Sequence, residues 1–116
     1  MAEKKTPVKR AAEKSARFCV GELVHHVLFN YRGVVIDVDM TFSGTDEYYE
    51  KMAPSRPPRD QPWYRVLVNG ANHETYVAER NLEPDREGTR IHHPDIEQYF
   101  GEFTRGRYVM KGRRKN

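Results

Sequence analysis

The chain has few of the features that mark secreted, membrane or disulfide-stabilised proteins. Its 116 residues include one cysteine, so no internal disulfide can form. A lone thiol fits a reducing compartment, and we therefore expect a cytoplasmic protein, with association with the nucleoid as an alternative. No apolar run approaches the roughly 20 residues of a membrane-spanning helix, and the basic N-terminal region lacks the apolar stretch of a secretory signal, so no membrane partner is expected. Cys19, between Phe18 and Val20, is expected to be a buried and unreactive thiol.

Motifs for catalysis and metal binding are also missing. There is no Gly-x-Ser-x-Gly elbow, no glycine-rich phosphate loop and no zinc-ligand spacing. The adjacent pairs His25-His26 and His92-His93 would point to opposite faces of a strand rather than converge on one ion. Asp37 and Asp39 share one face of a predicted strand, where a solvated acidic face is favoured over a pair of catalytic carboxylates. We therefore expect no enzyme activity, no catalytic residues, no metal site and no cofactor.

Charge is distributed unevenly along the chain. Residues 1–17 contain six basic and two acidic residues, residues 101–116 contain six basic and one acidic residue, and residues 18–100 have a net charge of −6. Basic segments attract a phosphate backbone by releasing counterions, whereas an acidic domain repels it. Any DNA affinity should therefore depend on the two ends, whose candidate phosphate-binding residues are Lys4, Lys5, Lys9, Arg10, Arg113, Arg114 and Lys115. A role of these charges in solubility, or in docking to an acidic partner, is the alternative.

The length allows one domain, which we place at residues 18–110. Residues 1–17 are rich in Lys, Ala and Glu and have too little apolar surface to offset the entropy of ordering, which predicts a disordered basic arm. A basic tail follows at 111–116. Residues 41–61 form a long loop with several prolines, and loops of that length are usually functional or disordered. Within that loop, residues 46–52 match one helical turn.

The apolar pattern of the domain is that of short strands. Residues 21–29 predict a strand with a bulge, and residues 30–33 predict a turn in which Gly33 adopts a positive φ. Residues 34–40 alternate between an apolar and an acidic face, which is typical of a half-buried strand. Residues 63–68 are nearly all apolar and predict a strand buried on both faces. Together these strands predict a mainly β fold, a small barrel.

Turns and a helix complete the prediction. Residues 69–72, Asn-Gly-Ala-Asn, predict a hairpin that leads into a partner strand at residues 73–78. Residues 80–84 resemble a single turn ended by proline. A short C-terminal helix is expected to begin at Pro94 and to pack on the barrel through Ile96, Tyr99, Phe100 and Phe103. Residues 108–110 then form a last strand or close the edge of the sheet.

Several aromatic residues lie beside arginine and have two interpretations. Tyr31-Arg32, Trp63-Tyr64-Arg65 and Tyr76 could form a stacking and cation–π surface for nucleic acid. The alternative is a buried core with its rim, because Trp and Tyr bury large areas and need one polar contact. We favour the core for Trp63 and leave both interpretations open for Tyr31 and Arg32, which are expected in a turn.

Four blocks of the chain resemble the hemimethylated DNA-binding family, also called YccV-like, of the heat-shock protein HspQ type. The matching segments are Gly21–Val35, Gln61–Val68, Thr75–Leu82 and Ile91–Phe103. One departure is Met40, where a proline is expected after the second aspartate of the Val-Asp strand. The resemblance implies an SH3-like, partly open antiparallel β-barrel and binding to hemimethylated double-stranded DNA. It also implies a role in heat or proteotoxic stress, an adaptor function toward an ATP-dependent protease such as Lon, and homo-oligomers, with a trimer as the first expectation.

Two main hypotheses for function follow. The first is a DNA-binding module in which Tyr31, Arg32, Arg56 and Arg59 approach the duplex while the basic ends hold phosphates. The second is an adaptor or specificity enhancer for a stress protease, which docks through residues 41–61 and a mobile terminus. The acidic centre favours the second hypothesis and the basic ends favour the first. A chaperone-like stress factor without a fixed partner is a weaker third.

Overall fold

The computed structural model describes residues 15–52 and 55–111. The described chain is built mainly of short strands, with two short helices and one 3₁₀ turn. In chain order the elements are β1 (Leu23–His26), β2 (Arg32–Asp39), α2 (Asp46–Met52), β3 (Trp63–Val68), β4 (Glu74–Ala78), η2 (Glu79–Asn81), β5 (Leu82–Pro84), α3 (Ile96–Tyr99), β6 (Phe100–Thr104) and β7 (Arg107–Met110).

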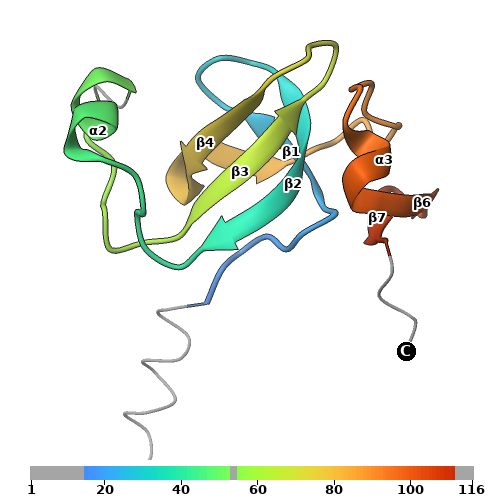
Figure 1. Cartoon of the computed structure of the whole chain (residues 1–116), viewed down its shortest axis with the longest axis horizontal. Helices are drawn as coiled ribbons and strands as arrows, with labels where there is room; N and C mark the ends of the chain where they lie inside the picture. Colours follow the sequence, from blue (N-terminus) through green and yellow to red (C-terminus); the bar gives the residue numbers. More distant parts are fainter. Residues whose placement is uncertain (1–14, 53–54, 112–116) are drawn as a thin grey trace, which may run out of the picture.

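Five of the described strands form one antiparallel sheet in the order β4-β3-β2-β1-β5. Because β4 and β5 are both edges of this sheet, it curls without closing into a barrel. The remaining two described strands, β6 and β7, pair as a separate hairpin. Figure 1 shows α2 and this hairpin at opposite sides of the five-stranded sheet. The predicted mainly β, antiparallel and partly open arrangement is confirmed.

Strand β3 is buried on both faces, as its nearly continuous apolar sequence predicts. Neighbouring residues of a strand point to opposite faces, so Val66 and Leu67 enter different clusters. The cluster around Val66 also contains Tyr64 and Phe18, whereas the cluster around Leu67 contains residues of the C-terminal hairpin. Two hydrogen bonds connect the first cluster to the segment before β1 and to η2. The Tyr64 hydroxyl accepts a hydrogen bond from the Phe18 amide and donates one to the Glu79 carboxylate.

The C-terminal segment corrects one prediction. The helix expected from Pro94 to Phe103 is reduced to the four residues of α3, and Phe100 and Phe103 belong to strand β6. The helical spacing was misleading because Phe100 is buried against the main sheet while its backbone pairs with β7. A turn at Arg105-Gly106, where both residues have positive φ, connects β6 to β7. The last strand, which the sequence left open, is therefore present as β7.

The turn between β1 and β2 corrects a second prediction. The turn lies at residues 27–29, earlier than expected, and both Arg32 and Gly33 belong to β2. Asn30 rather than Gly33 takes the positive φ, at 57°. Gly33 is needed for a different reason, because a β-carbon at this position would clash with the side chain of Val66 and the carbonyl of Leu67. The strand expected at 21–29 consequently ends at His26.

Helix α2 matches its predicted range. The Thr45 hydroxyl accepts a hydrogen bond from the Tyr48 amide at 3.0 Å and so satisfies one free donor of the first turn. Tyr49 is buried against Trp63, which fixes the helix to the end of the sheet. The turn expected at residues 80–84 is shorter than predicted, because η2 ends at Asn81 and the next three residues form β5 against β1.

Cys19 is exposed, so the prediction of a buried thiol is wrong. Its neighbour Phe18 points into the core and leaves Cys19 on the surface. There the thiol accepts a hydrogen bond from Arg107 and lies 3.7 Å from a carboxylate oxygen of Glu22.

Candidate nucleic-acid interface

A hollow that we call the aromatic cavity opens between the β1–β2 turn, strand β4 and the loop that follows α2. Its volume is about 370 Å³, which falls in the usual range for sites that take a small ligand. Its lining includes the aromatic rings of His26, Phe29, Tyr31, Tyr48, Trp63 and Tyr76, together with Thr75. These rings come from two separate groups, one on the β1–β2 turn and one on β3, β4 and α2.

The first ring group is built on His26. Its side chain is 4% exposed, and its Nδ1 accepts hydrogen bonds of 3.1 Å from the backbone amides of Leu28 and Phe29. Burial lowers the pKa of His26, and the neighbouring His25 lowers it further. Both effects favour the neutral ring, in which Nδ1 can accept these hydrogen bonds. The ring of Phe29 stacks on His26 with centroids 4.7 Å apart. The turn therefore keeps a fixed shape although its apolar side chains face solvent.

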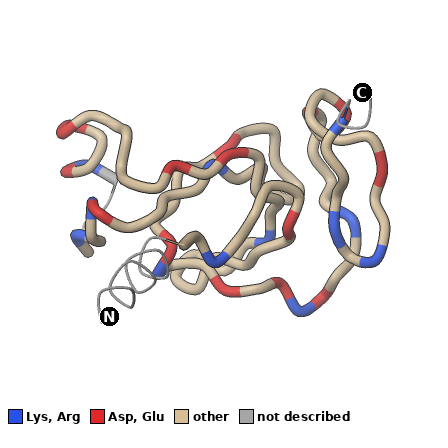
Figure 2. Tube along the Cα trace, turned by 90° about the horizontal axis from the view of Figure 1, so that it is seen from below, with Lys and Arg blue, Asp and Glu red and all other residues tan. Residues whose placement is uncertain are grey.

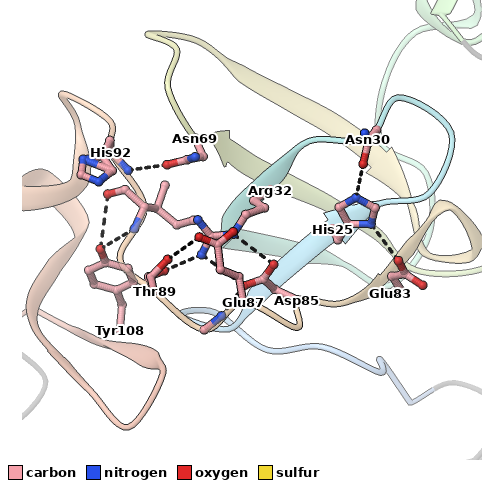
Figure 3. Close-up of polar contacts among 12 residues, drawn as sticks. His25, Asn30, Arg32, Asn69, Glu83, Asp85, Glu87, Thr89, His92 and Tyr108 are labelled. Atoms are coloured by element: carbon pink, nitrogen blue, oxygen red, sulfur yellow. Dashed lines mark hydrogen bonds and ion pairs between the residues drawn. The ribbon is translucent and has the colours of Figure 1, made fainter.

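His25 holds the opposite side of the same turn. Its Nε2 lies 2.7 Å from Oδ1 of Asn30, and its Nδ1 lies 2.7 Å from the Glu83 carboxylate (Figure 3). Hydrogen bonds to Asn30 and Glu83 raise the pKa of His25, against a smaller opposing effect of burial. Two adjacent histidines thus have opposite pKa shifts, and together they support the unusual backbone of Asn30.

The second ring group surrounds Trp63, which is 2% exposed, and confirms the prediction that Trp63 belongs to the core. Tyr76 packs on Trp63 with ring centroids 5.4 Å apart and donates a hydrogen bond to the Asp39 carboxylate. Burial and this bond raise the pKa of Tyr76 to about 12. The hydroxyl of Tyr48 donates to the backbone carbonyl of Tyr76 at 3.2 Å. The ring of Tyr48 is thereby fixed beside the outer edge of β4.

Tyr31, one of the predicted DNA-binding residues, lies at this cavity. Its hydroxyl and that of Thr75 are 2.6 Å apart, which joins the β1–β2 side of the cavity to β4. Ser55 and Pro57 line the same cavity from the loop after α2. The structure therefore brings Tyr31 to the loop that carries the predicted residues Arg56 and Arg59.

Arg56 and Arg59 lie on the surface and pair with carboxylates of α2. Arg56 Nη1 is 2.8 Å from Glu50, and Arg59 Nη1 is 2.9 Å from Asp46. The guanidinium of Arg59 also lies 4.1 Å from the ring centroid of Tyr49. Ion pairs this exposed contribute little, so a phosphate can replace either carboxylate at small cost. Whether the two arginines contact DNA stays a prediction.

Arg32 does not join this group, although it follows Tyr31 directly. Its guanidinium makes two parallel bonds to Asp85, from Nε at 3.0 Å and from Nη2 at 3.1 Å, and also reaches Glu87 and the Thr89 carbonyl (Figure 3). The Arg32 side chain is 14% exposed and that of Asp85 is 3% exposed. Burial opposes ionisation of Asp85, yet bonds from Arg32 and the Gly88 amide hold its pKa below the usual value. The described contacts of Arg32 are thus structural ones.

The remaining predicted DNA-binding residues lie outside the described part of the chain: Lys4, Lys5, Lys9, Arg10, Arg113, Arg114 and Lys115. The structure does show where both ends leave the domain. The Arg17 amide donates to the Glu79 carboxylate at 2.8 Å, and the Lys111 amide donates to the Tyr99 carbonyl at 2.9 Å. Around the sheet itself, acidic and basic positions are interspersed (Figure 2). The basic ends therefore begin at positions held on the domain surface.

Sequence reasoning missed several residues of the aromatic cavity. Leu28 and Phe29 were assigned to a strand, but they lie in the β1–β2 turn and are 58% and 69% exposed. The available signal was three consecutive apolar residues directly before Asn30, a residue that tolerates positive φ. For Tyr48 and Asn81 the signal was weaker, because their place at the cavity depends on how α2 and η2 pack on β4.

Within residues 15–52 and 55–111, no group of three or more His, Cys, Asp or Glu is placed to hold a metal ion. No helix in that part of the chain has the length and apolar character needed to cross a membrane.

The fold and the cavity define a small, partly open β-sheet module with an aromatic cavity beside an arginine-bearing loop. The family model described as "Hemimethylated DNA-binding protein YccV like" matches residues 16–107, which is most of the chain. The chain therefore belongs to the YccV-like family. That family is one of DNA-binding domains rather than of known enzymes.

Proposed function

We propose that this protein is a non-enzymatic module that binds double-stranded DNA and prefers the hemimethylated form. Membership of the YccV-like family over residues 16–107 is the observation that carries the proposal. The aromatic cavity adds a surface suited to bases, because every base offers a π-face to aromatic rings.

Affinity in this proposal comes mainly from the basic ends. Residues 18–100 have a net charge of −6, so the domain as a whole repels phosphate. Near the cavity, Arg56, Arg59 and Arg80 are exposed cations, and Arg80 donates to the Ser55 carbonyl at 2.7 Å. These residues position the duplex, while the ends supply most of the counterion release.

Methylation contributes specificity rather than affinity. One methyl group adds an apolar contact, and a good base contact is worth about 1–3 kcal/mol of discrimination. The preference for hemimethylated DNA should therefore be modest and should add to a strong background of non-specific binding.

A second candidate function is an adaptor for an ATP-dependent stress protease. The acidic centre of the chain and the exposed apolar turn with Leu28 and Phe29 favour it, since both suit a protein partner. A role in heat stress and a homotrimer stay predictions from the family resemblance, and a cytoplasmic location stays a prediction from the single cysteine.

Amide chemical-shift mapping of the isotope-labelled full-length protein tests which face meets DNA. On adding a hemimethylated duplex we expect the largest shifts at residues 27–31, 55–59 and 75–81, because these segments surround the aromatic cavity. Shifts on the C-terminal hairpin β6–β7 report on the basic C-terminal end that follows it and do not test the cavity. A bound duplex that causes no shifts around the cavity would contradict the proposed interface.

A further inference from the structure

The aromatic cavity has an apolar projection at its rim. Leu28 and Phe29 line the cavity and yet are among the most exposed large apolar side chains of the described chain. Their backbone amides are both bound to Nδ1 of His26, so the turn that carries them is rigid (the cyan loop between β1 and β2 in Figure 1). Packing of the core does not require an exposed apolar turn beside a concave aromatic surface, so this pair of features points to a ligand.

Polar groups in the cavity suit the edge of a nucleobase. The hydroxyls of Tyr31 and Thr75 form one pair at the wall. Asn81 also lines the cavity, and its side-chain amide makes no hydrogen bond with any described residue, so it offers both a donor and an acceptor. Flipped bases are bound in proteins by stacking between apolar or aromatic side chains and by hydrogen bonds to the base edge.

We propose that the aromatic cavity receives the methylated base after it has left the base stack, while Leu28 and Phe29 enter the space that it vacates. This inference rests on the proposed DNA-binding function and names the ligand of the same site. Apolar side chains inserted between base steps are a known means of unstacking a duplex. The methyl group then contacts an apolar wall, whereas an unmethylated base loses that contact.

A peptide fits the same cavity less well. An extended peptide would bind by pairing with the outer edge of β4, but the Tyr76 carbonyl already accepts a hydrogen bond from the Tyr48 hydroxyl. In an antiparallel pair, opposite residues alternate between hydrogen-bonded and non-hydrogen-bonded pairs. The Val68 amide donates to the His73 carbonyl, so Tyr76, three residues further along β4, is in a non-hydrogen-bonded pair and its backbone groups point away from β3. One of the edge carbonyls that strand addition would use is therefore already bonded, while the ring surfaces remain available.

Fluorescence of 2-aminopurine placed directly 3′ of the methylated base tests the inference. The full-length protein is added to two hemimethylated duplexes, one with N6-methyladenine and one with 5-methylcytosine, and binding is followed in parallel by anisotropy. We expect about a threefold rise in fluorescence on at least one of them and a smaller rise on the unmethylated duplex, since a neighbour that leaves the stack no longer quenches the probe. The double variant Leu28→Ser, Phe29→Ser should lose this rise.

The matched control is Val109→Ser, Met110→Ser, a pair of exposed apolar residues on β7 that should retain the full rise. Circular dichroism of both variants checks that each is folded. Binding by anisotropy with unchanged fluorescence on both methylated duplexes would overturn base extrusion and leave the DNA-binding function intact. Lack of binding to any duplex would instead remove the proposed function. Unchanged fluorescence, with shifts at Leu28 and Phe29 on adding an apolar peptide, would assign the cavity to a protein partner.

Discussion

A chain reduced to residues 15–111 should bind duplex DNA about a thousandfold more weakly than the full-length protein at low salt. The removed segments contain eight basic residues and two acidic ones, and the remaining chain has a net charge of −3. Each neutralised phosphate contributes roughly 0.9 to the slope of log affinity against log salt, so the salt dependence should also become much flatter. Binding isotherms at several salt concentrations measure both effects.

The ends of this truncation follow from the structure. Arg17 and Phe18 are bonded to Glu79 and Tyr64, so removal of residues 15–17 would also disturb the core. A full-length variant with the eight basic residues changed to glutamine is the matched control, because it removes the charge and keeps the length. It should lose as much affinity as the truncated chain. Tight, methylation-sensitive binding by residues 15–111 would disprove the electrostatic argument while leaving the family assignment in place.

Replacement of Arg32 by methionine should lower the free energy of unfolding by about 3–5 kcal/mol. The change leaves the Asp85 carboxylate, whose side chain is 3% exposed, without its partner. Domains of this size have a total stability of about 5–15 kcal/mol, so the loss is a large part of it. Urea unfolding measures the effect. The double variant Arg32→Met, Asp85→Asn should recover part of the loss because it removes the unpaired charge.

Arg56→Met is the matched control for this experiment. It breaks an ion pair with Glu50 in which both side chains are more than half exposed, and it should leave the free energy of unfolding almost unchanged. The comparison also decides the role of Arg32 in DNA binding. If Arg32→Met is as stable as the unchanged protein and yet loses DNA affinity, Arg32 contacts the duplex as the sequence predicts and its bonds to Asp85 are secondary.

The elements that could be predicted from the sequence are those whose pattern is local. Strand β3 is apolar throughout, and helix α2 has an N-terminal Thr45 before its acidic first turn. The helix expected from Pro94 failed because the β6–β7 pairing determines the state of Phe100, and that pairing depends on a turn several residues further on. Local periodicity carries no information about such a partner.

The same distinction applies to the candidate site. Tyr31 was predicted from its expected position in a turn, and it does line the aromatic cavity. Arg32 was grouped with it because the two are adjacent, but its ion-pair partner Asp85 is 53 residues further along the chain. The exposure of Leu28 and Phe29 depends on the buried ring of His26, which accepts hydrogen bonds from their backbone amides. A run of apolar residues alone predicts burial, so this surface could not be found from the sequence.

Fluorescence anisotropy on one duplex in unmethylated, hemimethylated and fully methylated forms tests the central claim most directly. The full-length protein is titrated at about 50 mM and about 200 mM salt, a range over which non-specific binding weakens strongly. Our account predicts tightest binding to the hemimethylated duplex at both concentrations. Equal binding to all three forms that disappears at the higher salt would contradict it. The basic ends would then bind any polyanion, and the domain would not distinguish the methylation states of DNA.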